Sequence, residues 1–256
     1  MRTMEKKALI RSAPIAAAVL LAACGGGGGG SSSDNSGETV RLEPGAFLTT
    51  VQYEDGGTAE AITFLSSSGK YVSAVEQDDV TLGNISFSGS NTLSGSGQNV
   101  FFLNGWQSVQ GQLNGTVNST ERATINATAP SFTSVVTLER DNQYSDSGAQ
   151  FSQINGTYTM LQGGITFELT VATDGTITGS DSTGCAVNGA ATIPDPQYNI
   201  LDIEFTASNC GPIAGEATAA QRNGDFSGLG AYDQSLNEFQ FGGTNGDVAL
   251  VFVGTR

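Results

Sequence analysis

From Thr39 onward, apolar residues recur at every second position in short runs, and no helical period extends beyond a turn or two. In one such run, Phe167, Leu169 and Val171 alternate with polar or small residues. Gly, Asn, Asp and Ser separate the runs, which is typical of antiparallel strands joined by tight turns. The pattern predicts an all-β chain, an antiparallel meander that forms one or two small barrels or sandwiches.

A polar stretch without alternation, residues 141–153, interrupts this pattern. We therefore expect an N-terminal β domain over residues 39–150 and a C-terminal, barrel-like β domain over residues 151–256. Small residues in the second domain, among them Gly228 and Gly230, let strands curve sharply, as in a small closed barrel.

In two runs, the apolar residues do not all fall on one face of the expected strand. Along residues 80–87 the apolar set changes parity near Gly83-Asn84, which predicts a β-bulge there. In the last run, Leu250 and Phe252 face opposite Val251, which predicts a strand that is covered on both sides.

The N-terminus has the order of a bacterial export signal, with a basic start and then a run over residues 13–23 that is apolar apart from Pro14. This run is well short of the about 20 residues that a membrane-spanning helix needs. The sequence "LAAC", ending at Cys24, resembles the lipobox of bacterial lipoproteins. The resemblance implies a signal peptide over residues 1–23 and acylation of Cys24, with palmitate-type chains that anchor the protein in the membrane.

After Cys24 the chain is almost only Gly and Ser up to residue 38. Such a segment buries no apolar surface and behaves as a flexible linker. Gly25 follows the cysteine, where inner-membrane retention in enteric bacteria favours Asp. The same resemblance therefore implies the outer membrane.

Charge and composition exclude several classes of function. Without the signal peptide, six basic residues stand against 24 acidic ones, a formal charge of −18. Nucleic acids and anionic lipid surfaces are repelled by such a chain. The sequence contains no histidine, so Ser-His-Asp, Cys-His and His-zinc sites are excluded. We expect no cofactor and no metal centre.

Carboxylate pairs and a Ser-Lys arrangement around Lys70 are the catalytic chemistries left open. Alternation places Asp202 and Glu204 on the outer face of a strand, whereas Asp78 and Asp79 lie in a turn. Because solvated surface explains both pairs, we expect a protein that is not an enzyme.

Two further features have both a functional and a structural interpretation. Asp174, Thr176 and Asp181 supply oxygens around Gly175, as in half of a calcium loop, but the further acids and the terminal Glu of such a loop are missing. A hairpin turn is the expected structure. Trp106, the only tryptophan, suggests a platform for a sugar or base, although a core or rim position is favoured.

Acylation of Cys24 leaves Cys185 and Cys210 as an even pair, which predicts a disulfide in an oxidising envelope. A hairpin folded about residues 197 and 198 places the two cysteines opposite each other. Closing this loop stabilises the fold by roughly 3 kcal/mol in the chain-entropy model. A redox-active pair is the alternative, but no CxxC spacing supports it.

Residues 151–256 resemble a group of uncharacterised proteobacterial outer-membrane lipoproteins. They share a Gly-x-Tyr opening, a D-G-T-[IL]-x-G turn, a G-C-x-x-x-G strand, an Asn-centred turn and an N-C-G close. The resemblance implies a β domain with a hairpin disulfide and carries no known activity. The matching positions are Gly156, Tyr158, Asp174, Gly175, Gly179, Gly184, Cys185, Gly189, Asn199, Asn209, Cys210 and Gly211.

The chain also bears a fainter resemblance to small eight-stranded barrels of surface lipoproteins that bind host proteins, and to lipocalin-like barrels. Fold analogy alone does not assign a function. We expect a non-catalytic, lipid-anchored module that binds an envelope protein or polysaccharide at the outer membrane. The alternatives are a lipocalin-like carrier of a small apolar ligand and, less favoured, a carboxylate-based enzyme that acts on glycans.

Overall fold

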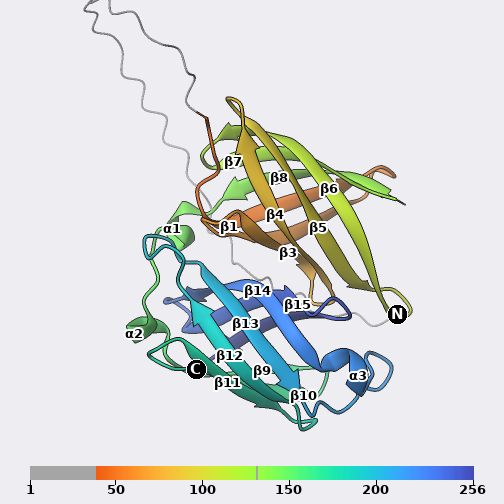
Figure 1. The fold of residues 1–256 in the computed structure, drawn as a ribbon, viewed down its shortest axis with the longest axis vertical. Helices are drawn as coiled ribbons and strands as arrows, with labels where there is room; N and C mark the ends of the chain where they lie inside the picture. Colours follow the sequence, from red (N-terminus) through yellow and green to blue (C-terminus); the bar gives the residue numbers. More distant parts are fainter. Residues whose placement is uncertain (1–38, 131) are drawn as a thin grey trace, which may run out of the picture. The chain divides into compact units, whose positions relative to one another are not determined.

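Two closed, antiparallel, eight-stranded barrels make up the part of the chain that the computed structural model describes, residues 39–130 and 132–256. Strands β1 to β8 form the first barrel and β9 to β16 form the second (Figure 1). The predicted all-β meander is therefore confirmed. The predicted signal peptide, Cys24 and the linker up to residue 38 lie outside the described residues.

The first barrel contains β1 (Gly45–Tyr53), β2 (Thr58–Leu65), β3 (Lys70–Glu76), β4 (Asp79–Ser88), β5 (Thr92–Phe102), β6 (Trp106–Ser119), β7 (Arg122–Ala129) and β8 (Phe132–Arg140). The second contains β9 (Gly156–Gln162), β10 (Ile165–Val171), β11 (Thr176–Asp181), β12 (Ala186–Thr192), β13 (Leu201–Ser208), β14 (Gly224–Asp233), β15 (Glu238–Thr244) and β16 (Ala249–Thr255). The described helices are α1 (Asn142–Ser145), α2 (Phe151–Ile154) and α3 (Ala219–Arg222). No helix within these residues is long and apolar enough to cross a membrane.

Inward-facing side chains form an apolar cluster in the first barrel. Phe47, Leu65 and Leu93 belong to one buried apolar cluster inside it. A polar group lies in the same interior, where the hydroxyl oxygens of Thr49 and Thr63 are 2.8 Å apart. The barrel interior therefore combines an apolar and a hydrogen-bonded part.

The predicted bulge at Gly83-Asn84 is wrong. Strand β4 pairs with β5 in one unbroken register from Asp79 to Ser88. The apolar parity changes because β4 is buried on different faces along its length. Ile85 belongs to the cluster inside the first barrel, whereas Val80 is fully buried on the outer face, where β4 packs against β15 and β16.

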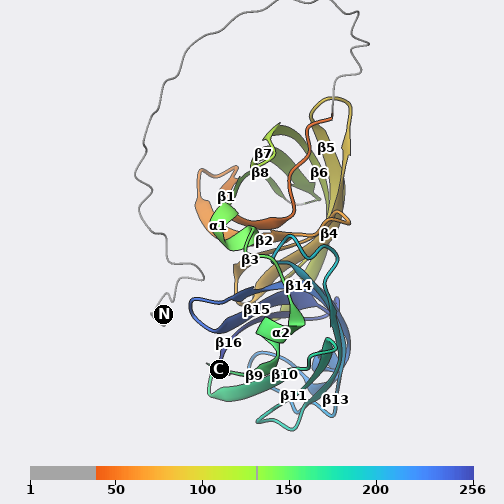
Figure 2. The same ribbon diagram turned by 90° about the vertical axis from the view of Figure 1, so that its left-hand side faces the viewer.

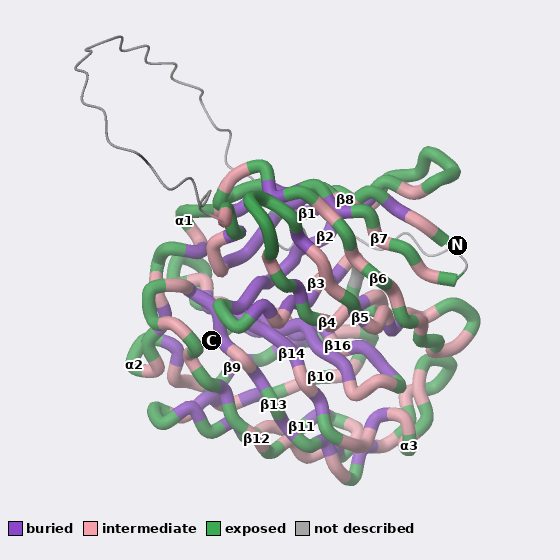
Figure 3. The backbone as a smooth tube through the Cα atoms, turned by 45° about the horizontal axis from the view of Figure 1, so that its top comes forward, coloured by how far each residue is buried: buried purple, intermediate pink, exposed green. Residues whose placement is uncertain are grey.

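The two barrels pack through the outer faces of β2 to β4 and of β14 to β16. A Cβ atom at Gly242 of β15 would lie 3.0 Å from Val72 Cγ1 of β3, so these strands approach closely. Val251 and Phe252 are both buried although they point to opposite faces. The prediction that the last strand is covered on both sides is therefore confirmed, and Figure 3 shows buried backbone along β14 and β16.

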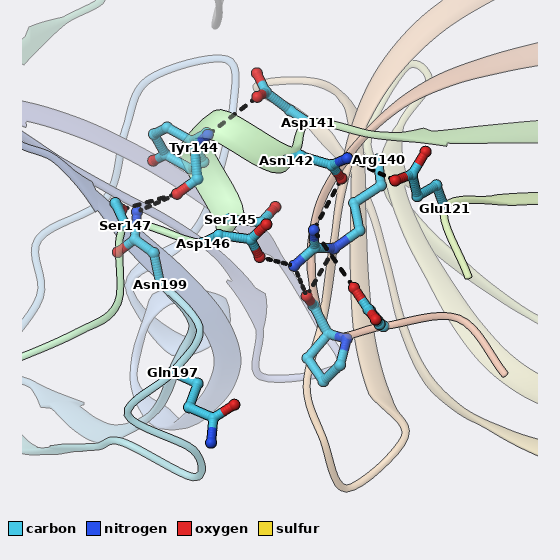
Figure 4. Close-up of polar contacts among 12 residues, drawn as sticks. Glu121, Arg140, Asp141, Asn142, Tyr144, Ser145, Asp146, Ser147, Gln197 and Asn199 are labelled. Atoms are coloured by element: carbon cyan, nitrogen blue, oxygen red, sulfur yellow. Dashed lines mark hydrogen bonds and ion pairs between the residues drawn. The ribbon is translucent and has the colours of Figure 1, made fainter. Parts of the chain in front are cut away.

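A connecting segment joins the two barrels. Arg140, the last residue of β8, holds this segment against the first barrel. Its guanidinium group donates to the carbonyl oxygen of Pro44 at 2.7 and 3.0 Å, to Asn142 Oδ1 at 2.9 Å and to Asp146 Oδ1 at 2.5 Å (Figure 4). Helices α1 and α2 lie along this connecting segment (Figure 2).

Asn199, in the β12–β13 loop, fixes the same segment to the second barrel. Its side-chain amide donates to the carbonyl oxygens of Tyr144 at 3.3 Å and of Tyr232 at 2.8 Å. Its Oδ1 accepts the backbone N–H of Tyr232 at 3.1 Å. The connecting segment is thus hydrogen-bonded to both barrels.

A disulfide joins Cys185 to Cys210. The hairpin register differs by one residue from the predicted one, because Ala186 pairs with Ser208. Continuing this register would place Asn209 opposite Cys185. Asn209 has a φ of 56°, in the left-handed region that Asn tolerates, and this turn of the backbone brings Cys210 to Cys185.

Candidate ligand cavity in the second barrel

The second barrel is filled with side chains at the end next to α2. The Tyr158 ring is fully buried, with its centroid 5.4 Å from that of Phe239 and 6.2 Å from that of Tyr232. The Arg256 guanidinium lies 5.5 and 5.2 Å from the centroids of the two tyrosine rings and donates to Tyr232 Oη at 2.6 Å. Burial raises the pKa of Tyr158 to about 12, although the Arg256 charge opposes this shift.

The opposite end of the same barrel is hollow. A cavity of about 160 Å³ lies there, and most of its wall is apolar. Phe205 and Phe226 stack on this wall with ring centroids 5.0 Å apart, and Phe241 lies 5.7 Å from Phe205. Other apolar side chains of the wall include Phe167, Leu169, Val187, Ala207, Leu250 and Phe252.

Glycines make room for these aromatic rings. A Cβ atom at Gly228 would lie 2.6 Å from the Phe241 ring, and one at Gly243 would lie 2.5 Å from it. Real Cβ atoms do not approach other atoms this closely, so any larger residue at either position displaces Phe241. The small residues of β14 and β15 therefore place the Phe241 ring on the cavity wall.

The cavity opens to the surface at this end. Phe167, Val187 and Leu250 line it and remain partly exposed. Nearby, β9 and β16 close the barrel through one described residue pair, Thr159 with Thr255. Beyond this pair, the Val253 N–H donates to Met160 Sδ at 3.2 Å.

Trp106, the first residue of β6, brings the first barrel to the cavity. It packs against the core cluster of the second barrel and lines the cavity. Its ring contacts Phe102 edge to face, with centroids 5.6 Å apart. The indole Nε1 is buried, and no residue within the described ranges accepts a hydrogen bond from it.

A buried ion pair belongs to the polar part of the wall. The Arg222 guanidinium of α3 contacts the Asp181 carboxylate, and the two side chains are 9% and 2% exposed. Thr183 donates to Asp181 Oδ1 through its N–H at 2.7 Å and its hydroxyl at 2.6 Å. Burial alone would raise the pKa of Asp181, but the hydrogen bonds from Thr183 and Arg222 outweigh it and lower the pKa below its ordinary value.

The carboxylates of the possible calcium loop are engaged within the fold. Asp174 Oδ1 accepts the Thr176 N–H at 2.9 Å in the hairpin turn, and this hydrogen bond lowers the pKa of Asp174. Asp181 is paired with Arg222. Among the described residues, no cluster of three or more His, Cys, Asp or Glu side chains could hold a metal ion.

Lys70 and Asp202, two of the residues considered for catalysis, form an ion pair with each other. Lys70 Nζ donates to Asp202 Oδ1 at 2.5 Å and to Ser227 Oγ at 2.8 Å. Asp202 is therefore partly buried against Lys70 of the first barrel, and the expectation that it is solvated surface is wrong. Glu204 is exposed on the outer face of β13, as alternation predicts.

The second carboxylate pair lies in the first barrel. Asp79 Oδ1 accepts a hydrogen bond from Asn99 Nδ2 at 2.6 Å, and Asn99 also donates to Thr81 Oγ1 at 3.1 Å. Asp78 is exposed in the turn before β4 and lies at the edge of the cavity. The two carboxylates therefore have separate environments.

Fold and site together define a two-barrel β protein with an apolar cavity inside its second barrel. Neither a protein-family model nor a curated protein sequence matches the chain. Among solved structures, the crystal structure of isotype 1 transferrin binding protein B from serogroup B Neisseria meningitidis matches with 8% identity and a TM-score of 0.29. The match covers 81% of this chain and 64% of that one, less than two thirds of its length. A likeness this distant carries no functional argument.

Proposed function

We propose that the chain is a non-catalytic binding protein of the bacterial envelope whose second barrel holds a small apolar molecule. The observation that carries this proposal is the apolar cavity of about 160 Å³ between Phe205, Phe226 and Leu250. In another protein, an apolar cavity of about 150 Å³ binds benzene or xenon. The size therefore suits one ring or a short branched chain.

The location in the envelope rests on the N-terminal sequence. The lipobox-like residues before Cys24 and the Gly/Ser segment after it support a lipid-anchored protein on a flexible tether at the outer membrane. An anchored binding protein remains beside the lipid phase in which apolar molecules concentrate. Binding of a further envelope protein or a polysaccharide stays a prediction.

A cavity-filling variant tests the proposal. Ala207 is buried on the cavity wall, so Ala207→Leu places additional atoms in the cavity. Ala127→Leu makes the same chemical change in the first barrel, where Ala127 pairs with Leu113 and Ser134. Ligand-detected NMR with toluene and ethylbenzene measures binding to the unmodified protein and to both variants.

We expect the unmodified protein and Ala127→Leu to bind ethylbenzene with similar affinity. Ala207→Leu is expected to weaken binding by about tenfold or more, which corresponds to about 1.4 kcal/mol. Absence of binding to the unmodified protein, or an equal loss in both variants, would contradict a ligand site in the second barrel.

A further inference from the structure

We propose that the Trp106 indole N–H is a hydrogen-bond donor to the ligand, so the ligand is a compact, neutral, mostly apolar molecule with one acceptor oxygen. A ketone, an ester or an ether has this chemistry. The inference rests on the proposed function and adds the chemical class of the ligand. It also makes the site a joint product of both barrels, because Trp106 belongs to the first.

The unpartnered indole nitrogen supports the first step. Trp106 Nε1 is buried and has no acceptor among the described residues. Buried donors are almost always hydrogen-bonded, because an unpaired donor loses its bond to water without replacement. Trp106 lines the cavity, so a ligand that carries an acceptor would satisfy this donor.

The other polar groups of the wall support the second step. The Arg222 guanidinium donates to the Asp181 carboxylate, to Thr183 Oγ1 at 2.8 Å and to the Gly211 carbonyl oxygen. Asp181 in turn accepts hydrogen bonds from Thr183. The other side-chain donors of the wall, Gln77, Gln162 and Ser180, are exposed or partly exposed and can bond to water. Trp106 Nε1 is the buried donor of the wall that lacks an acceptor among the described residues.

The charges around the cavity define the acceptor. Besides the paired Asp181, the wall contains the acidic residues Asp78, Glu168 and Glu216, and Arg222 is its one basic residue. A carboxylate ligand would meet repulsion from these acids and from the acidic chain as a whole. A neutral carbonyl or ether oxygen accepts the indole N–H without this repulsion.

The test compares ligands of equal shape. Acetophenone and ethylbenzene differ by a carbonyl oxygen in place of two hydrogens, and benzoate supplies the anion. Calorimetric titration of the full chain measures the affinities. Because Trp106 is the only tryptophan, its indole N–H gives a single peak in a ¹H–¹⁵N correlation spectrum, and this peak moves downfield when the N–H donates to an oxygen.

We expect acetophenone to bind about tenfold more tightly than ethylbenzene, as one additional hydrogen bond allows, and benzoate to bind more weakly than both. Acetophenone is also expected to move the indole peak downfield beyond its position with ethylbenzene. Trp106→Phe keeps a ring against Phe102 but has no N–H, so its affinities for acetophenone and ethylbenzene should be equal, whatever its overall affinity.

Two results separate the inference from the proposed function. Equal affinities of the unmodified protein for acetophenone and ethylbenzene, without an additional shift of the indole peak, would overturn the role of Trp106 and leave the cavity site standing. Absence of binding by both compounds would overturn the site itself. A Trp106→Phe variant that keeps the preference for acetophenone would also contradict the inference, because this variant has no indole N–H.

Discussion

Lys70 Nζ of the first barrel lies 2.5 Å from Asp202 Oδ1 of the second barrel, so one ammonium group links the two. The same group donates to Ser227 Oγ at 2.8 Å. The side chains of Lys70 and Asp202 are 15% and 26% exposed, so the pair is largely withdrawn from water. This contact connects residues that are 132 positions apart in the chain.

A double-mutant cycle measures what this link contributes. We expect Lys70→Met and Asp202→Asn each to lower the free energy of unfolding, with a coupling energy of about 1 kcal/mol, at the upper end of the range for partly exposed pairs. Urea unfolding of the four proteins supplies the cycle. Strictly additive effects would contradict an energetic link between the barrels at this position.

The buried pair beside the cavity is expected to contribute more. Arg222→Met leaves the Asp181 carboxylate, which is 2% exposed, without its counter-charge. Removing one partner of a buried pair costs about 3–5 kcal/mol. Arg122→Met is the matched control, because Arg122 and Glu139 form a pair whose side chains are 62% and 55% exposed. A similar small loss in both variants, measured by urea unfolding, would show that burial of the Arg222 pair does not stabilise the fold.

Alkaline pH is expected to destabilise the end of the second barrel that is filled with side chains, next to α2. The pKa of Tyr158 is about 12 in the folded protein, against an ordinary value of 10.0. The unfolded chain therefore loses this proton first as pH rises. The stability that the neutral phenol provides is complete below pH 10 and decreases between pH 10 and 12.

Tyr158→Phe removes this titration together with the hydrogen bond from Tyr158 Oη to the Ile154 carbonyl oxygen. The variant should be less stable by about 1 kcal/mol at neutral pH and should lose stability less steeply above pH 10. Thermal unfolding at a series of pH values measures both effects. Parallel pH profiles for the two proteins would contradict the assignment of the alkaline loss to Tyr158.

Membrane attachment is expected to depend on one residue. Cys24→Ser removes the thiol that the lipobox-like sequence presents for acylation, so the variant should no longer incorporate a labelled fatty acid or sediment with the membranes. Fractionation after labelling with radioactive palmitate measures both. Cys185→Ser with Cys210→Ser is the control, because it removes the disulfide and leaves Cys24 intact. Unchanged labelling of Cys24→Ser would contradict anchoring through Cys24.

Alternation along the chain predicted the meander and many of the inward residues. Successive side chains of a strand point to opposite faces, so a strand with one buried face has apolar residues at every second position. Alternation gave the wrong interpretation of β4, where Val80 is buried on the outer face by the other barrel. A bulge and a change of buried face produce the same pattern. The packing of one barrel on the other is a long-range contact that a local pattern does not contain.

The cysteines show a similar limit. Their spacing predicted that they pair, and the structure joins them. The pairing of β12 with β13 is shifted by one residue from the predicted register. The left-handed φ of Asn209 compensates for this shift. An Asn within a polar turn signals that such a conformation is allowed, but its effect on the register depends on the strand pairing around it.

The cavity was the least predictable feature. The inward set that includes Phe205, Phe226 and Leu250 fits a filled interior and a hollow one equally well, because alternation specifies direction and not volume. Trp106 comes from the other barrel and reaches the cavity only in the folded chain. The one early signal was the pair of small residues Gly228 and Gly230 in β14, which indicate close approach by neighbouring atoms.

The central claim is that the second barrel holds a small ligand in its interior, and intermolecular nuclear Overhauser effects with bound acetophenone test it most directly. The account predicts contacts from the acetophenone protons to the rings of Phe205, Phe226 and Trp106, and none to Phe47 in the first barrel. Contacts confined to exposed residues such as Leu161, or to Phe47, would contradict it.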